Sequence, residues 1–560
     1  MKIFPLLALL LTSVLNAQWQ TETYSLKGGW NSIYLHGDAS HATIDTLFAS
    51  NLEVEEVWRW IPNPSQVGFT TSPLIPASGT PEWVVWTRDG GANTLTKLAG
   101  QSAYLVKCAG TASSTYAVPI VQRPLTPSTN WVRNGANFLG FPATRTSTVK
   151  FSNYFSTFSA ATAANTKIFK YIGGGLSAAN PLQIFSPTNE NVDRNQAYWF
   201  DSKVVGNFYA PVQITFSSAT GLDFGRTGSR ITARVLNRRN TPMTLSMAPV
   251  TSNTPPTGQE GITGAVPLTR RTFDAGSASF IETPLVTQNI VIAPQSTIEL
   301  TFGIDRGAMG GTPDALFASM VRFTDAANEF DILIPAVARK SSLAGLWIGE
   351  ALVSAVESKA QADAVTPTKN GYPLRYIIHV SDDGTARILS QVFLGTQAAL
   401  PNNFGLCTKE SGLKADSKAT AKRIVSVHMP LDRVLTGTGT VALGSDLTSA
   451  ISIPFDDPTN PFVHQYHPDH NNLDEKGNPL GAGFESYTIE RQLTFTFTAT
   501  PPAGSSVTSG WGSSVIGGTY AEVVQGLHKD SAGVGTGDGL HLTGTFELRR
   551  ASELGTLTIN

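Results

Sequence analysis

Apolar and polar residues alternate in short stretches along most of the chain. Ile231, Ala233 and Val235 fall on one side of one such stretch, and residues 297–304 and 493–498 repeat the pattern. A period of two residues is typical of a β-strand that buries one face. Glycine and proline are frequent between these stretches, as expected for short strands joined by turns. The pattern predicts an all-β fold made of several antiparallel β-domains.

The chain from residue 340 to 560 is predicted to be one antiparallel C-terminal β-domain. Two apolar runs, residues 374–380 and 385–394, flank the pair Asp383-Gly384, and Asp-Gly is a strong signal for a hairpin turn. Further strands are expected at residues 345–350, 518–523 and 542–548. These strands fit a β-barrel or a sandwich, and the sequence leaves both open.

The N-terminal part carries the same pair of motifs twice. Gly29-Trp30-Asn31 opens the first copy and Gly135-Ala136-Asn137 opens the second, and the closing strands contain Tyr104 and Tyr198. Each copy also has a short helical candidate between these motifs. The candidates are residues 42–49 and 149–158. This repetition predicts two duplicated β-modules, which we place at residues 18–124 and 125–217.

These two segments resemble modules of exported bacterial proteins that open on a Gly-Trp-Asn strand and close on a Gly-Tyr-Trp strand. The first copy keeps Trp30, and the second keeps Tyr198-Trp199 but has Ala136 in place of the opening tryptophan. The resemblance implies an extracytoplasmic β-module and assigns no chemistry to it.

Residues 218–339 carry a different set of motifs. Leu222-Asp223-Phe224-Gly225 opens the segment, Asn237 and Pro242 bracket a turn, and Pro294-Gln295 precedes a strand. The segment is similar to abnormal-spindle/Hydin-like immunoglobulin-type domains. This similarity implies an immunoglobulin-like β-sandwich that serves as a spacer or interaction module. Residues 249–271 would be an insert beyond the compact form.

The first 17 residues have the features of a secretory signal peptide. Lys2 gives a short positive region, residues 3–11 are apolar, and Ala17 is a small residue at the expected cleavage site. The mature chain is then expected to begin at Gln18 and to be secreted, periplasmic or held at the cell surface. No later stretch has the ~18 uninterrupted apolar residues of a membrane helix, so we expect no membrane span.

The charge balance limits the classes of binding partner, and the cysteine content limits disulfide bonding. The chain has 40 Lys and Arg against 42 Asp and Glu, a net charge of −2, without a basic stripe. This balance argues against a nucleic-acid partner and leaves a cell-surface protein or a glycan. Cys108 and Cys407 are expected to be buried free thiols, although the compartment also permits a disulfide.

Residues 456–479 form a loop rich in proline and in side chains that ligate metals. The predicted ligands are His464, His467, Asp469 and His470. Imidazoles and carboxylates at this density suit zinc or another divalent metal. If one coordination position held water, Asp457 or Glu475 could act as the general base of a metal-dependent hydrolase using the His464–Glu475 loop. The alternative is a solvated loop whose histidines and aspartates cap turns.

A second candidate site lies among the tryptophans of the first module. The predicted ligand-binding residues are Trp58, Trp60, Trp83 and Trp86. Trp58 and Trp60 are two positions apart and therefore share one face of a strand. Exposed aromatic side chains stack on sugar rings, so this set would make the protein a glycan binder. Large aromatic side chains are also common in cores and interfaces.

The chain contains no Gly-x-Ser-x-Gly, no phosphate-binding P-loop and no His-Glu-x-x-His motif. We therefore expect an exported cell-surface or extracellular structural or binding protein without enzymatic activity. The metal-dependent hydrolase and the glycan-binding protein are the two alternatives.

Overall fold

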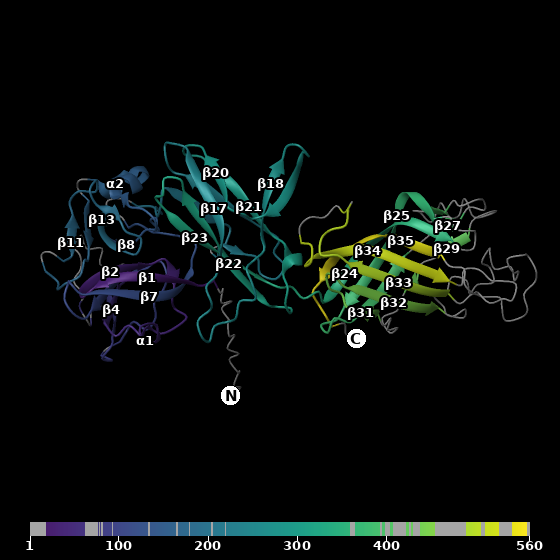
Figure 1. Ribbon diagram of the computed structural model, residues 1–560, viewed down its shortest axis with the longest axis horizontal. Helices are drawn as coiled ribbons and strands as arrows, with labels where there is room; N and C mark the ends of the chain where they lie inside the picture. Colours follow the sequence, from purple (N-terminus) through teal and green to yellow (C-terminus); the bar gives the residue numbers. More distant parts are fainter. Residues whose placement is uncertain are drawn as a thin grey trace, which may run out of the picture. The chain divides into compact units, whose positions relative to one another are not determined.

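The computed structural model describes residues 18–61, 77, 79, 82–91, 93–132, 135–163, 166–177, 180–202, 205–218, 220–358, 365–392, 395–397, 404–406, 422–424, 427–428, 437–453, 489–503, 505, 510–525 and 540–556. Strands take up 53% of the chain and helices 5%, which confirms the all-β prediction. Among the described residues, no helix is long and apolar enough to cross a membrane. The chain divides into two compact units (Figure 1). They are Met1–Ile304 with Met309–Lys340, and Asp305–Ala308 with Ser341–Asn560.

The first module packs a four-stranded sheet against a three-stranded one. Its elements are β1 (Gln20–Lys27), β2 (Gly29–Leu35), β3 (Gly37–Asp38), α1 (Ile44–Leu47), β4 (Val54–Trp60), β5 (Trp83–Thr87), β6 (Ser102–Cys108) and β7 (Thr115–Pro124). The strand orders are β2-β6-β4-β5 and β1-β7-β3. Side chains from both sheets, such as Leu26, Val57 and Ile120, are buried together. Cys108 belongs to this core as a buried free thiol, whereas Cys407 lies outside the described residues.

The second module repeats the strand order of the first. Its elements are β8 (Gly135–Leu139), β9 (Val149–Lys150), α2 (Phe151–Tyr154), η1 (Ser156–Thr162), β10 (Lys167–Lys170), β11 (Leu182–Ile184), β12 (Asn191–Val192) and β13 (Tyr198–Ser202). The order β8-β13-β10-β11 corresponds to β2-β6-β4-β5, and β12 pairs with β9. The opening and closing motifs therefore lie on adjacent strands in both copies. Both α1 and α2 fall within the predicted helical segments.

The repeated asparagine has the same hydrogen bonds in each copy. The Asn31 side chain accepts from the Lys27 N–H at 2.9 Å and donates to the Lys27 carbonyl at 2.7 Å. The Asn137 side chain does the same with Val132, at 2.7 Å and 2.9 Å. A side-chain amide has one acceptor and one donor group, so it matches both polar groups of one residue's backbone. The motif asparagine is therefore a backbone clamp.

The repeated tyrosine also closes a backbone contact five residues earlier. The Tyr104 hydroxyl accepts from the Ala99 N–H at 2.8 Å and donates to the Ala99 carbonyl at 3.0 Å. The Tyr198 hydroxyl accepts from the Asp193 N–H at 2.8 Å. Burial raises the pKa of both phenols above the ordinary range, which keeps them protonated. The duplicated motif residues therefore make equivalent backbone contacts in both modules.

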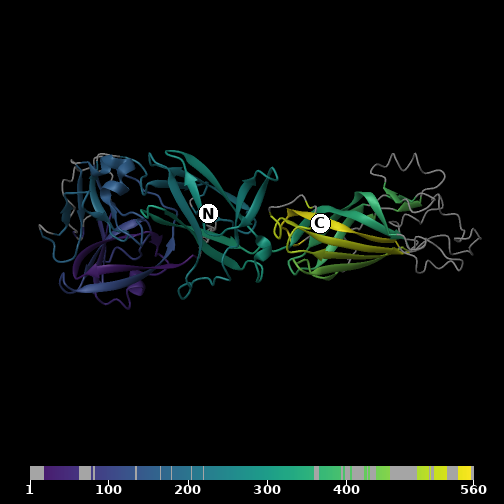
Figure 2. The same cartoon turned by 45° about the horizontal axis from the view of Figure 1, so that its top comes forward.

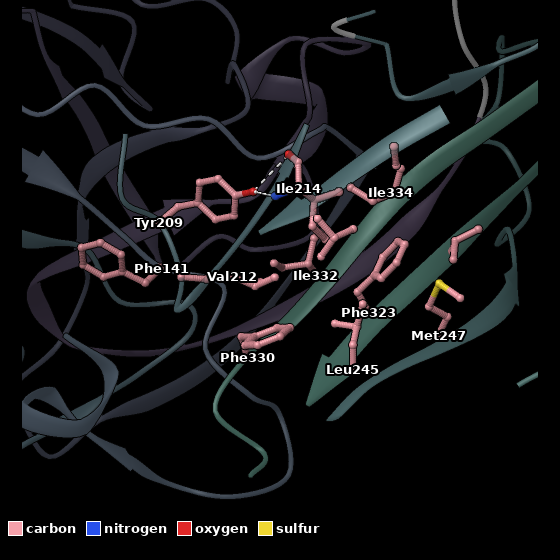
Figure 3. Close-up of a cluster of buried hydrophobic side chains, with 14 of the residues drawn as sticks. Phe141, Tyr209, Val212, Ile214, Leu245, Met247, Phe323, Phe330, Ile332 and Ile334 are labelled. Carbon is pink, nitrogen blue, oxygen red and sulfur yellow. Dashed lines mark hydrogen bonds between the residues drawn. The ribbon is translucent and has the colours of Figure 1, made fainter. Parts of the chain in front are cut away.

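Two five-stranded sheets follow and form a β-sandwich. Its strands are β14 (Val212–Phe216), β15 (Leu222–Asp223), β16 (Arg230–Asn237), β17 (Met243–Thr251), β18 (Leu268–Asp274), β19 (Ser279–Pro284), β20 (Gln288–Ile292), β21 (Thr297–Ile304), β22 (Leu316–Asp325) and β23 (Asp331–Arg339). The orders are β14-β16-β21-β18-β19 and β15-β23-β22-β17-β20. Apolar residues of both sheets meet in one core, where the Tyr209 hydroxyl binds the Ile214 backbone (Figure 3). The alternation on β16 and β21 matches the prediction, because Ala233, Val235 and Leu300 are buried.

Asn237, at the predicted turn, is fully buried and ties its own turn to the end of β20. Its side chain donates to the Thr241, Ile292 and Ala293 carbonyls at 2.9, 3.2 and 3.1 Å. Its oxygen accepts from the Arg239 N–H at 2.9 Å. Part of the predicted insert is regular structure, since β17 extends to Thr251 and β18 begins at Leu268.

The second unit is built on a nine-stranded antiparallel sheet that curls into a half-barrel (Figure 2). Its strands are β24 (Gly345–Ser358), β25 (Val365–Val380), β26 (Ala386–Val392), β30 (Val427–His428), β31 (Gly437–Gly439), β32 (Asp446–Ile453), β33 (Ile489–Phe497), β34 (Val515–Gln525) and β35 (Leu540–Ser552). A small sheet contains β27 (Gly395–Gln397), β28 (Phe404–Leu406) and β29 (Lys422–Ile424). A single curled sheet with one buried face is closer to the barrel alternative than to a sandwich. The hairpin at Asp383-Gly384 is confirmed, because Val380 pairs with Ala386 across it.

Candidate functional site

The predicted metal ligands belong to the loop of residues 456–479. His464, His467, Asp469 and His470 all lie outside the described residues. The metal site therefore stays a prediction from the sequence. Within the part of the chain that the structure describes, no group of three or more His, Cys, Asp or Glu side chains is arranged to hold a metal ion.

The four candidate tryptophans do not form one exposed platform. Trp58, Trp83 and Trp86 are 7%, 5% and 1% exposed. Trp86 lies in the core of the first module, where its ring N–H donates to Asp45 at 2.9 Å. Trp58 and Trp60 share a face of β4, as expected, but that face is covered. Stacking on a sugar needs an open ring face, and three of these four rings are buried, so glycan binding by this set stays a prediction.

The cover on that face is the second module. Trp60 meets Trp199 edge to face with 5.0 Å between ring centroids, and Trp83 meets it at 6.5 Å. Phe138 stacks on Trp199 at 4.3 Å, with 7° between the ring planes. We call this set, Trp58, Trp60, Trp83, Phe138 and Trp199, the tryptophan interface. Buried aromatic pairs of this kind contribute about 0.5–1.5 kcal/mol each beyond the burial of their area.

Backbone contacts extend the joint beside the tryptophan interface. The Trp30 N–H donates to the Gly174 carbonyl and the Gly173 N–H donates to the Trp30 carbonyl, both at 2.8 Å. Gly29 has φ of +85°, and a Cβ there would lie 2.3 Å from the Gly174 carbonyl oxygen. Any larger residue at Gly29 would push the two modules apart. The Gly-Trp-Asn opener of the first module therefore also serves the contact with the second.

An ionic cluster links both modules to the sandwich. Arg145 binds the two Glu22 oxygens at 2.6 and 2.7 Å and Asp331 at 3.0 Å, and Arg322 binds Asp331 at 2.9 Å. Burial raises the pKa of Asp331, but the hydrogen bond from Arg322 and the charges of the surrounding arginines outweigh it, so the pKa lies below its ordinary value. Arg194 lies 3.7 Å from Glu22. We call Glu22, Arg145, Arg194, Arg322 and Asp331 the ionic cluster. Arg322 and Asp331 are nine positions apart, but the other members are distant in the sequence, and no local pattern marks them.

A small cavity of about 40 Å³ lies against the ionic cluster. Its lining includes Glu22, His36, Arg194 and Asp331. The His36 Nε2 donates to the Arg194 carbonyl at 2.7 Å, and burial lowers the pKa of this imidazole well below its ordinary value. This space is suited to roughly one to three water molecules bridging polar groups. It is too small for a substrate, so we assign it a structural role.

A larger cavity, of about 330 Å³, lies in the second unit beside the hairpin turn of β25 and β26. His379 and Arg387 face each other across these strands and both line it, together with Asp382. His379 is 1% exposed and its Nε2 donates to the Leu554 carbonyl at 3.1 Å. The His379 Nδ1 and Arg387 Nε have no hydrogen-bond partner among the described residues. These donors and acceptors can bind a polar molecule. The described lining residues do not form the nucleophile, base and orienting group of a catalytic site.

The buried face of the half-barrel also carries a polar cluster that is not among the predicted site residues. Arg491 donates to Glu522 at 2.6 Å, and Glu522 also accepts from the Tyr520 hydroxyl. The Tyr376 hydroxyl lies 2.5 Å from that of Tyr520. Arg491 is two positions before the buried Leu493, so strand parity predicts that it points inward. The charges of Arg491 and Glu522 compensate each other within the sheet.

No protein-family model matches the chain, and no curated protein is similar to it. The resemblances to Gly-Trp-Asn modules and to abnormal-spindle/Hydin-like domains therefore rest on their motif residues. They remain predictions about the type of module and domain, whereas the strand orders and the asparagine contacts are observed in the structure.

Proposed function

We propose that this protein is an exported structural or binding component of the cell surface or extracellular space and acts without catalysis. The observation that carries the proposal is the tryptophan interface. The side chains best suited to bind a ligand in the first module instead fasten it to the second. Large aromatic residues buried between the two modules hold them together, as a structural protein requires.

The ionic cluster supports the same role. It ties β1 of the first module and Arg145 of the second to Asp331 at the start of β23. The sandwich formed by β14–β23 would then act as an immunoglobulin-like spacer joined firmly to the modules. The protein's partners would be a cell-surface protein or a glycan, outside the joints described here.

The export part of the proposal is tested by the mass and location of the mature protein. Expressed with its first 17 residues in a bacterium that exports proteins, the chain should be recovered outside the cytoplasm with Gln18 as its first residue. Protease added to intact cells or to periplasmic extract should digest it. An uncut chain confined to the cytoplasm would contradict the proposal.

The metal-dependent hydrolase remains the competing function, because its ligands lie outside the described residues. Elemental analysis of the full mature chain separates the two functions when it is paired with a His467→Ala/His470→Ala variant. We expect no stoichiometric zinc or other transition metal in either protein. Stoichiometric metal in the wild type that is lost in the variant, together with hydrolysis of a generic ester or peptide substrate, would favour the hydrolase.

A further inference from the structure

The β18–β19 hairpin leaves one edge of the sandwich open. β19 is the last strand in the order β14-β16-β21-β18-β19, and no strand in the described part of the chain pairs with its outer side. β18 and β19 stay in register from Thr269 opposite Pro284 to Asp274 opposite Ser279, without a bulge. A long, regular edge is a template for another strand. Figure 1 shows β18, the partner of β19 in this hairpin, at one margin of the sandwich.

The hydrogen-bond alternation identifies the unpaired groups of this edge. The Leu285 N–H donates to the Leu268 carbonyl at 2.8 Å, which fixes the phase of the antiparallel ladder. Alternate residues of β19 then face β18, and the residues between them face outward. Ile281 belongs to the inward set. Phe280 and Glu282 point their backbone N–H and C=O groups away from β18, as does Pro284, which has no N–H.

Exposed apolar side chains surround these groups. Phe273, Phe280 and Ile281 are 59%, 57% and 41% exposed. The rings of Phe273 and Phe280 meet edge to face at 5.4 Å, and the Arg271 guanidinium lies 4.1 Å from the centre of the Phe280 ring. Soluble proteins usually protect such an edge with charged side chains, especially lysine, or with proline, a bulge or a covering segment. β19 contains no lysine, and its ladder with β18 has no bulge. Its proline, Pro284, is the last residue of the strand, and its one charged residue, Glu282, is paired with Arg230.

We propose that β19 pairs with the β19 strand of a second copy of this chain, antiparallel and about a two-fold axis through Ile281. Antiparallel pairing of a strand with itself is symmetric and closes after two copies. Phe280 of each copy would lie opposite Glu282 of the other, with a reciprocal pair of backbone hydrogen bonds on each side of the axis. The two Ile281 side chains would meet at the axis.

The neighbouring registers are less favourable, which is why the axis falls at Ile281. An axis at Glu282 would place the two Glu282 side chains directly opposite each other, and like charges opposite one another destabilise a sheet. It would also leave the Phe280 carbonyl without a donor, because Pro284 has no N–H. An axis at Phe280 would place Glu282 opposite Ala278, whose φ of +50° belongs to the turn and not to a strand. The register centred on Ile281 pairs the N–H and C=O groups of both Phe280 and Glu282 and keeps the two carboxylates apart.

Sedimentation velocity of the full mature chain over a range of concentrations tests the proposal. We expect the wild type to shift from monomer to dimer as its concentration rises. Ile281→Lys places a charge on the axis and should remain monomeric, whereas Ile281→Val, a conservative control, should dimerise like the wild type. A wild type that stays monomeric at the highest concentration, or an Ile281→Lys variant that dimerises equally well, would overturn the proposal.

Amide hydrogen exchange of the wild type alone gives a second readout that does not depend on a variant folding. The Phe280 and Glu282 amides should be protected only at concentrations where the dimer forms. The Ile281 amide, bonded to β18, should be protected at every concentration. Exchange of Phe280 and Glu282 that does not change with concentration would overturn this pairing, and neither result bears on export or catalysis.

Discussion

At the scale of single residues, the duplicated motif asparagine explains why a short sequence recurs in both modules. Asn31 and Asn137 each hold the N–H and C=O of one earlier backbone residue. A typical intramolecular hydrogen bond contributes about 0.5–1.5 kcal/mol to stability, and each asparagine makes two such bonds to the clamped residue. The asparagine is thus needed for the local fold of each module, whatever the protein binds.

Replacing this clamp should lower stability measurably. We expect Asn31→Ala to reduce the free energy of unfolding by about 1–3 kcal/mol, because the Lys27 backbone loses both of its side-chain partners. Urea denaturation followed by tryptophan fluorescence measures the change. Asn289→Ala, at an exposed position of β20, is the matched control and should have little effect. Equal stability of the two variants would contradict the clamp.

A second residue-scale prediction concerns pH. Burial and the charge of Arg194 lower the pKa of His36 well below its ordinary value, so the folded chain keeps this imidazole neutral. In the unfolded chain the same group gains a proton as the pH falls through about 6.5. The unfolded state then binds more protons, so the free energy of unfolding decreases with falling pH, by at most about 1.4 kcal/mol per pH unit from this group.

His36→Gln should remove that contribution. Urea denaturation of the wild type and the variant at about pH 7.5 and about pH 5.5 compares their pH dependence directly. We expect a shallower loss of stability on acidification in the variant. The same slope in both proteins would show that His36 titrates as freely in the folded chain as in the unfolded one.

At the scale of secondary-structure elements, the sequence predicts strands and their faces well. Alternation is a property of a strand itself, so the buried positions Ala233, Leu300 and Leu493 could be predicted without knowing the rest of the fold. The Asp383-Gly384 hairpin follows for the same reason, since the turn depends on those residues. The repeat predicts equivalent strands, and the four-stranded sheets of the two modules have the same strand order.

The segment that packs over a strand face could not be predicted from the alternation of residues. Parity places Trp58 and Trp60 together, but only the fold shows that Trp199 lies over them. The ionic cluster is harder still, because Glu22, Arg145 and Asp331 come from three separate segments. Charged residues in strands and loops are common, and nothing local distinguishes the few that meet in a buried cluster. The predicted metal loop has no periodic pattern to place it.

The tryptophan interface yields a prediction at this scale. Trp199→Ala should lower the free energy of unfolding of the first unit by about 3–5 kcal/mol, because it removes a buried ring that touches Trp60, Trp83 and Phe138. Differential scanning calorimetry should show a lower transition temperature for this unit and an unchanged one for the second. Phe185→Ala is the control, since Phe185 is 82% exposed. Similar effects of the two substitutions would argue against a buried joint.

At the scale of the whole molecule, the two modules and the sandwich belong to one compact unit. The tryptophan interface joins module to module, and the ionic cluster joins both to β23. Two joints built from different interactions restrict hinge motion more than either would alone. This continuity is the basis for proposing a structural role, and the open β19 edge offers a way for such units to pair.

Native-state hydrogen exchange shows whether the two modules and the sandwich open as one body, because it reports the opening free energy of each strand in the intact chain. The slowest amides of β4, β13 and β23 represent the first module, the second module and the sandwich. If the joints hold these parts together, the three strands should share one opening free energy, and Trp199→Ala should lower it for all three. A first module whose amides exchange at a distinctly lower free energy than those of β23 would show independent domains on a flexible chain and would contradict the account.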